Sequence, residues 1–168
     1  MPAREVLLFP HPTLKRTARP LGTERRDEAE RVAADLLDTM RAHPGCVGLA
    51  APQLGELVRM VAVDVSEHPK VETSHGLLLL VDPEVASESG AEVAREGCLS
   101  IPQLTANVRR ATEIELRART PAGEPIELRS EGFEARCLLH EIDHLDGLLF
   151  LDRVDSLTTD VFRRKRYK

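Results

Sequence analysis

The pentapeptide HEIDH at residues 140–144 is the part of this sequence with the clearest potential for chemistry. On a helix, His140 and His144 lie one turn apart on the same face, separated by a rise of about 6 Å, so their imidazoles can converge on one metal ion. Glu141 lies beside them, where it can exchange a proton with an attacking water rather than coordinate the metal. The pattern predicts a catalytic metal site in preference to a solvated helix with two unrelated histidines.

Two histidines are an incomplete ligand set, because a catalytic site of this kind has three protein ligands. The extended metallopeptidase pattern, with a third histidine three residues after a glycine, is excluded because Phe150 stands three residues after Gly147. No Glu and no His follows His144. The missing ligand is therefore a downstream aspartate or an upstream residue.

The cysteines are the upstream candidates. Cys46, Cys98 and Cys137 are odd in number and far apart, which argues against a disulfide framework and favours free thiols. Cys137 would lie about 10 Å from His144 along the helix axis, so we expect it to be a core residue. Cys46 in PGCVGLAAPQ and Cys98 in EGCLSIP both lie in turn-like segments, and spacing does not choose between them.

Two helices are expected to frame the chain. Apolar residues recur at intervals of three and four between Asp27 and Met40, which predicts an early amphipathic helix. Asp27 with Glu30 is expected to cap its N-terminus, and His43-Pro44-Gly45 to end it. The late helix carries HEIDH within GFEARCLLHEIDHLDG, with Gly147 placed as its C-cap.

Strands are expected between these helices. The runs LVRMVAVDV at 57–65 and LLLLVDPEV at 77–85 are rich in branched apolar residues and indicate buried strands. TEIELRA at 112–118 and PIELR at 125–129 alternate apolar and charged residues, which predicts an antiparallel hairpin. The fold class is therefore α+β, with antiparallel strands packed around the late helix. We expect residues 1–168 to form a single domain.

Charge and composition limit the classes of partner that the protein can bind. The net charge of −5 gives no overall attraction to DNA. No apolar run approaches the roughly 18 residues of a membrane span, and the N-terminus lacks the features of a secretory signal, so we expect no membrane contact and a cytoplasmic location. The last residues, FRRKRYK, are strongly basic, and we interpret them as a solvated, frayed helix end.

Three ordered segments, GLAAPQ at 48–53, EGCLS at 96–100 and HEIDH at 140–144, resemble the motifs of the bacterial peptide deformylase family, and the similarity extends over nearly the whole chain. The resemblance implies that Cys98 is the third ligand of one divalent metal ion. It implies Fe(II) as that ion, with Zn(II), Ni(II) or Co(II) in aerobic preparations. The implied reaction removes the formyl group from N-formyl-methionyl nascent peptides and releases formate.

The resemblance also implies roles for individual residues. Glu141 would take a proton from the attacking water and deliver it to the leaving amine. The side-chain amide of Gln53 and the backbone N–H of Leu99 would stabilise the developing oxyanion. Gly48 would let the backbone pair with the substrate like an added strand. Further substrate contacts are expected from Val47, Gly97 and Phe133.

Three positions depart from the family pattern. Cys46 stands where a glycine is usual, Leu139 where many members have Gln, and Thr105 where some have a basic residue. None of them is a ligand or the general base, so we expect the chemistry to be retained.

Two rival functions and one further partner remain open. HEIDH alone is compatible with a metallopeptidase that cleaves internal peptide bonds. A non-catalytic module with a structural metal is disfavoured by Glu141, since structural zinc sites fill all four positions with protein ligands. The basic C-terminus suggests contact with ribosomal RNA, near the point where nascent peptides emerge.

Overall fold

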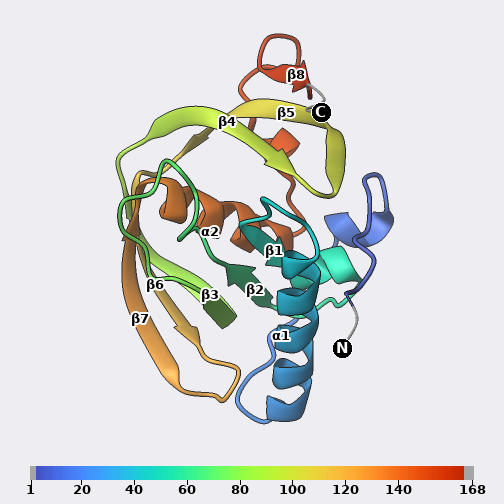
Figure 1. The fold of residues 1–168 in the computed structure, drawn as a ribbon, viewed down its shortest axis with the longest axis vertical. Helices are drawn as coiled ribbons and strands as arrows, with labels where there is room; N and C mark the ends of the chain where they lie inside the picture. Colours follow the sequence, from blue (N-terminus) through green and yellow to red (C-terminus); the bar gives the residue numbers. More distant parts are fainter. Residues whose placement is uncertain (1–2, 165–168) are drawn as a thin grey trace.

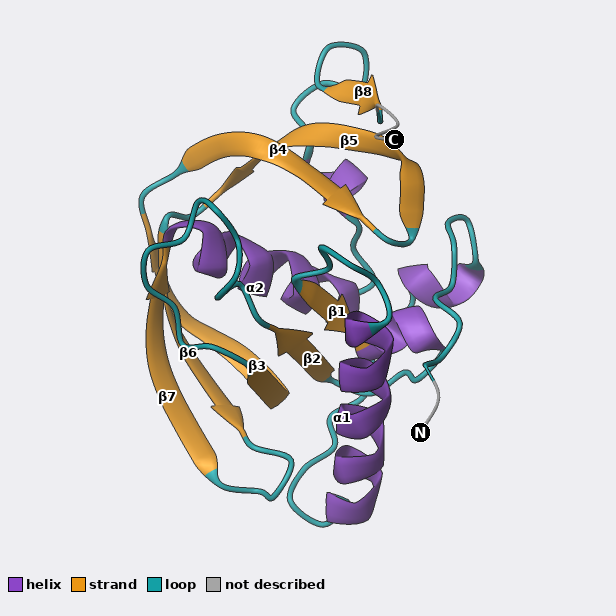
Figure 2. Ribbon diagram, in the orientation of Figure 1, coloured by secondary structure: helices purple, strands orange, loops and turns teal. Residues whose placement is uncertain are grey.

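The protein consists of two α-helices and two antiparallel sheets (Figure 1, Figure 2). The computed structural model describes residues 3–164. The larger sheet has the strand order β1-β2-β3-β6-β7, and the smaller sheet has the order β4-β5-β8. The strands are β1 (Gly48–Ala50), β2 (Met60–Val63), β3 (Leu78–Ser89), β4 (Glu92–Cys98), β5 (Ile101–Arg110), β6 (Glu113–Arg119), β7 (Pro125–Glu131) and β8 (Val161–Arg163).

Helix α2 (Gly132–Leu145) lies between the larger sheet and the long β4–β5 hairpin (Figure 1). Its apolar side buries Leu138 and Leu145 in a cluster with Val61 of β2 and Leu116 of β6. The burial of these side chains is the main force that fixes the position of the helix. The predicted α+β architecture around a late helix is therefore confirmed.

Helix α1 (Arg26–Arg41) packs beside the edge of the larger sheet, as the apolar periodicity predicts. Val32 and Leu36 are fully buried in a cluster with Leu49 of β1 and Met60 of β2. The predicted cap at Asp27 is wrong, because the helix begins at Arg26 and the preceding residue makes no capping side-chain bond. Acidic side chains in the first turn, Asp27 and Glu28, still interact favourably with the positive end of the helix dipole.

The strand predictions hold in part. The hairpin is confirmed as β6 and β7, with Leu116 opposite Leu128. The run at 57–65 contains only the shorter β2, whereas the run at 77–85 continues to Ser89 as β3. The hairpin of β4 and β5 was not predicted, and the segment around Cys98 that we interpreted as a turn is the end of β4. GLAAPQ, which we placed in a turn-like segment, forms the short strand β1 and a turn of 3-10 helix.

The interpretation of the basic C-terminus as a helix end is wrong for the described residues. Val161–Arg163 form β8, which pairs with β5 so that Phe162 lies opposite Thr105. The backbone N–H of Arg164 then donates to the carbonyl of Gln103 at 2.8 Å. The rest of the basic tail, from Lys165 onward, lies outside the described residues.

Gly147 ends α2 as predicted. Its backbone has a φ of 74°, and its N–H donates to the carbonyl of His144 at 3.2 Å. A Cβ at this position would lie 2.6 Å from the carbonyl oxygen of Lys15. Glycine is therefore required both by the left-handed turn and by the close approach of the N-terminal segment.

No helix within residues 3–164 is long and apolar enough to cross a membrane.

Candidate active site

Strand β4 and helix α2 run alongside each other, and their side chains meet in matched pairs. Glu96 and Cys98 are buried on one face of β4, while Gly97 between them is exposed. Glu96 meets His140, and Cys98 meets His144. Two residues of a strand span about 6.6 Å, and four residues of a helix span about 6 Å. The two spacings match, so one strand face serves both histidines.

Cys98, His140 and His144 form a metal site. Their ligand atoms all lie within 4.8 Å of one another, and all three residues are buried. The Sγ of Cys98 lies 3.5 Å from Nε2 of His144, which is about the separation of two donors that share a tetrahedral ion at roughly 2.1 and 2.3 Å. Mixed nitrogen and sulfur donors suit zinc, iron, nickel and cobalt. The side chains therefore fit a divalent transition metal.

Glu96 orients the first histidine. Nδ1 of His140 lies 2.8 Å from Oε1 of Glu96, so the N–H donates to the carboxylate and leaves Nε2 for the metal. Glu96 also accepts from Nε of Arg110 at 2.8 Å and from Nη1 of Arg136 at 2.6 Å. Arg110 continues to Asp143 at 2.6 Å. This group of buried charges joins β4, β5 and α2 around the site.

The negatively charged groups around His140 favour a positive charge at this position. Burial opposes charge on the imidazole, but Glu141, Cys98 and Glu96 together raise the pKa of His140 well above its ordinary value. Burial, with the charge of His140, lowers the pKa of His144 well below its ordinary value. A neutral imidazole is the form that ligates a metal, so His144 is already in that form at neutral pH.

Glu141 lies against the start of strand β1, at Gly48. A Cβ at residue 48 would lie only 2.7 Å from Oε2 of Glu141, so this close approach requires glycine. Burial raises the pKa of Glu141 to about 7. Oε1 of Glu141 and Nδ1 of His144 are the buried side-chain atoms without a hydrogen-bond partner in the described part of the chain. Both belong to the HEIDH segment.

Gln53 presents its amide N–H groups to the site. Its Oε1 accepts from the backbone N–H of Ala50 at 2.9 Å, which fixes the orientation of the amide. Its Nε2 then lies 3.0 Å from Oγ of Ser100 and 3.4 Å from Sγ of Cys98. Leu99 follows Cys98 in the turn between β4 and β5.

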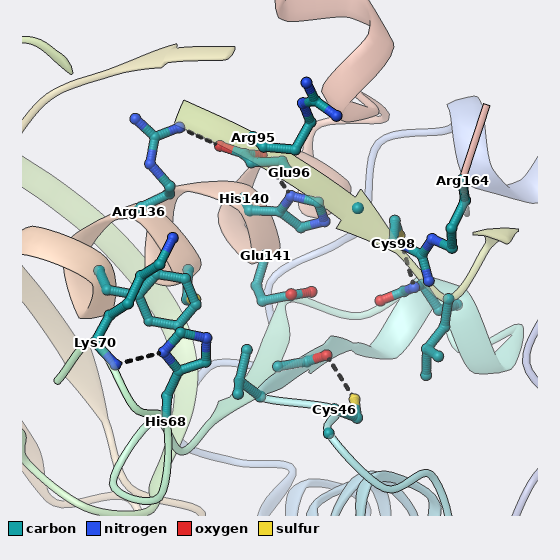
Figure 3. A pocket seen from close by; sticks show the side chains of 18 of the residues that line it. Cys46, His68, Lys70, Arg95, Glu96, Cys98, Arg136, His140, Glu141 and Arg164 are labelled. Atoms are coloured by element: carbon teal, nitrogen blue, oxygen red, sulfur yellow. Dashed lines mark hydrogen bonds and ion pairs between the residues drawn. The ribbon is translucent and has the colours of Figure 1, made fainter. Parts of the chain in front are cut away.

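A cavity of about 360 Å³ opens onto these groups (Figure 3). The structure brings nine of the ten residues singled out by the sequence to its wall, while His144 lies behind Cys98. The residues that line it are Val47, Gly48, Gln53, Gly97, Cys98, Leu99, Phe133, His140 and Glu141. Residues that the sequence did not single out also line it, namely His68, Lys70, Arg95, Glu96 and Arg136, and so does Arg164 of the basic C-terminus.

The other two cysteines are not in the metal group. Cys137 is packed in the apolar cluster around α2, as expected, and burial raises its pKa. Cys46 lines the cavity, and its Sγ donates to the carbonyl of Gly48 at 3.2 Å. Burial, together with the charge of Glu141, raises the pKa of Cys46 to about 12. Cys46 is therefore a neutral thiol, and a poor nucleophile or oxidation target.

The role of Glu96 gives a direct prediction. Glu96→Gln keeps the shape of the side chain but removes the charge that holds His140, so we expect metal affinity to fall about tenfold or more. Competition with a chelating dye measures the change. Glu92→Gln, on an exposed residue of the same strand, is the matched control and should bind metal like the wild type. Equal affinities for both variants would contradict the orienting role.

The chain is similar to known proteins over nearly its whole length. The family described as polypeptide deformylase matches residues 3–160. A peptide deformylase from Alkalilimnicola ehrlichii is 41% identical over 164 residues, which are 98% of this chain and 89% of that protein. The crystal structure of peptide deformylase from Thermotoga maritima has a TM-score of 0.82 and 32% identity, and the match covers 92% of this chain and 99% of that one.

A crystal structure of class I type b peptide deformylase from Acinetobacter baumannii, described as Met-ala-ser bound, has a TM-score of 0.82 and 31% identity. That match covers 90% of this chain and 99% of the other. Sequence similarity of this extent, joined to the same fold, does not support either rival function that HEIDH alone left open. The chain belongs to the polypeptide deformylase family and is a metal-dependent hydrolase that removes the N-formyl group from nascent peptides.

Proposed function

We propose that Glu141 is the general base and acid of the deformylation. The observation that carries this proposal is its buried Oε1, which has no hydrogen-bond partner in the described part of the chain and lies beside the metal ligands. The carboxylate would accept a proton from the attacking water and return it to the amine that leaves. Its pKa of about 7 suits both transfers near neutral pH.

Gln53 and Leu99 are proposed to stabilise the oxyanion that develops as water adds to the formyl carbon. The amide of Gln53 is held by Ala50, so its N–H groups face the site before the substrate arrives. Leu99 contributes its backbone N–H from the turn after Cys98. One N–H of Gln53 would turn from Ser100 or Cys98 to the oxyanion, a small change for an amide already held in place, and such donors are worth more in a buried site than in water.

The proposed substrate path follows the cavity wall. Gly48 exposes its backbone next to Glu141, where an extended peptide can pair with β1 as an added strand. Val47 and Phe133 are half-buried apolar residues that would contact the methionine side chain, and Gly97 of β4 also lines the cavity. The relative from Acinetobacter baumannii described as bound to Met-ala-ser supports a peptide in this cavity.

We propose Fe(II) as the native metal, held by Cys98, His140 and His144. When bound, a divalent ion supplies the positive charge that lowers the pKa of an attacking water. Zinc binds more tightly than iron to most sites of this kind, so Zn(II), Ni(II) or Co(II) would replace iron in aerobic preparations. Metal analysis of protein purified without oxygen distinguishes these ions.

The proposed setting is the cytoplasm, where N-formyl-methionyl nascent peptides are made, and residues 1–168 are proposed to act as one catalytic domain. The family match to residues 3–160 supports both statements. We further propose that the basic C-terminus contacts ribosomal RNA. Support comes from Arg163, which is exposed at the end of β8, and from the charge of the residues that follow it.

Removing charge from the C-terminus tests the ribosome contact. The combined change Arg163→Gln, Lys165→Gln and Arg166→Gln is expected to weaken binding to purified ribosomes and to reduce its salt dependence, because fewer phosphate contacts release fewer counterions. Arg164 is left unchanged because it lines the cavity. Arg117→Gln, at an exposed residue of β6, is the control. Binding that is unchanged at every salt concentration would exclude the contact.

The function itself is tested with protein purified without oxygen and reconstituted with Fe(II). We expect rapid formate release from a short formyl-methionyl peptide, with the peptide chain intact by mass spectrometry. Internal cleavage would instead indicate a peptidase. Absence of both reactions in protein with a full metal content would contradict the roles proposed for Glu141 and Gln53.

A further inference from the structure

The open side of the cavity carries positive charges that the deformylation does not use. Lys70, Arg95 and Arg164 line the cavity and are exposed. They come from three separate segments, which are the loop after β2, strand β4, and the residue after β8. Figure 3 shows Lys70 and Arg164 on opposite sides of the cavity, with Glu141 between them.

These cations have no partner of opposite charge among residues 3–164. Arg95 donates to neutral oxygens of Thr105 and Asn107 and stacks on the ring of Phe162 at 3.7 Å. Within the described part of the chain, no carboxylate pairs with Lys70 or Arg164. By contrast, the two carboxylates of the cavity lie deep. Glu96 is paired with Arg110, Arg136 and His140, and Glu141 is buried beside the metal ligands. The entrance is therefore electrostatically positive.

The side chain of Arg164 is exposed and lies over the wall of the cavity at Gly97. Its guanidinium lies over the exposed backbone of Gly97, where any larger residue would collide with it. The pairing of β8 with β5 ends one residue before Arg164 and fixes the position of the Arg164 backbone beside the cavity. On the other side, the backbone N–H of Lys70 donates to Nδ1 of His68 at 3.2 Å, and His68 stacks on Phe133 with ring centroids 4.0 Å apart.

The geometry of the reaction brings the substrate past these charges. The formyl carbon must reach the buried metal ligands, so the peptide beyond the methionine has to leave through the exposed side. An extended chain advances about 3.4 Å per residue, which places the second and third side chains near the entrance. We propose that Lys70 and Arg164, helped by the field of Arg95, select peptides with an acidic second or third residue. This inference rests on the substrate path proposed above.

Paired peptides test the selectivity. Formyl-Met-Asp-Ala is compared with formyl-Met-Asn-Ala, and formyl-Met-Ala-Asp with formyl-Met-Ala-Asn. At low salt, we expect kcat/KM to be higher for the Asp peptide than for its Asn counterpart, by roughly threefold for each cation that the Asp contacts. This factor corresponds to the usual contribution of one exposed ion pair. The difference should lie mainly in KM and should shrink at high salt. Calorimetric binding of the deformylated products should show the same preference for Asp over Asn.

Charge reversal makes the test independent of overall activity. In Lys70→Glu with Arg164→Glu, the preference should invert, so that formyl-Met-Lys-Ala becomes the better substrate. The neutral peptides serve as the internal reference for folding and metal content. Arg117→Glu, on an exposed residue that does not line the cavity, is the matched control and should keep the wild-type preference.

Three outcomes would overturn the proposal. One is equal kcat/KM for Asp and Asn peptides at low salt, and another is an unchanged preference after charge reversal. The third is a uniform rise in activity toward all peptides on removing Arg164, which would show that this side chain obstructs the entrance. In each case, deformylation of the neutral peptides would still proceed, so a failure of selectivity is distinguishable from a failure of the function.

Discussion

Glu141→Gln is expected to abolish most formate release while leaving the metal in place. The amide has the same size as the carboxylate but cannot take a proton from water, and general acid–base catalysis contributes roughly 10²- to 10⁴-fold to a rate. The carboxylate is not one of the three metal ligands. Metal content by elemental analysis should therefore match the wild type, while kcat falls by at least about 10².

Two other variants serve as controls for Glu141→Gln. His144→Ala removes a ligand, so it should lose both metal and activity. Glu127→Gln changes an exposed glutamate of β7 and should lose neither. If Glu141→Gln lost its metal as well, Glu141 would have to be counted among the ligands. If it kept full activity, the proton would have to move by way of another group.

Arg110→Met is expected to lower the free energy of unfolding of the metal-free protein by about 3 kcal/mol, because it leaves buried carboxylates without their shared partner. The Arg110 side chain is 4% exposed and bonds both Glu96 and Asp143. The loss stays at the lower end of the usual range because Arg136 still pairs with Glu96 and Arg153 with Asp143. Denaturant unfolding at neutral pH measures the change.

Lowering the pH should reduce the difference in the free energy of unfolding between Arg110→Met and the wild type. The bonds from His140 and Arg110 outweigh burial and hold the pKa of Glu96 well below its usual range. Its contribution to wild-type stability is therefore present at neutral pH and is lost as pH falls below the ordinary glutamate pKa of about 4.3. Without Arg110, one of the interactions that lower this pKa is lost while burial remains, so the pKa of Glu96 rises from its wild-type position and the variant is penalised most at neutral pH.

Arg117→Met is the matched control, because Arg117 pairs with Glu127 on an exposed surface and both side chains are more than half exposed. A surface pair of this kind contributes less than about 1 kcal/mol. A loss for Arg110→Met as small as that of the control would show that the buried charges are hydrated or already neutral.

The periodicity of apolar residues predicted those elements whose buried residues are apolar. The apolar residues of α2 recur at helical spacing, and those of the β6–β7 hairpin alternate with charged residues, so both elements can be recognised in the sequence. The β4–β5 hairpin has no such apolar pattern, because its buried face includes the charged residues Glu96 and Arg110. In a sequence, such a face looks like a solvated loop. β8 was missed for a similar reason, since its three residues are defined by pairing with β5 and not by their own composition.

The metal site was half visible in the sequence. The helical spacing of His140 and His144 is local, so it could be predicted from the chain alone. The choice between Cys46 and Cys98 depended on which thiol the fold brings to α2, and only the family resemblance supplied it. The partners of Glu96 come from β5 and α2. Contacts between segments so far apart in the sequence leave no periodic signal.

The matched rises of β4 and α2 determine which changes of length the catalytic unit can accept. Inserting one residue between Glu96 and Cys98 would turn one of the two side chains to the opposite face of the strand. Inserting one between His140 and His144 would rotate the second imidazole by about 100° around the helix. Substitution of a spacer such as Ile142 changes neither relation. Three residues of strand and five of helix thus form a unit whose lengths are fixed, and both spacings would have to be kept if the metal site were moved to another scaffold.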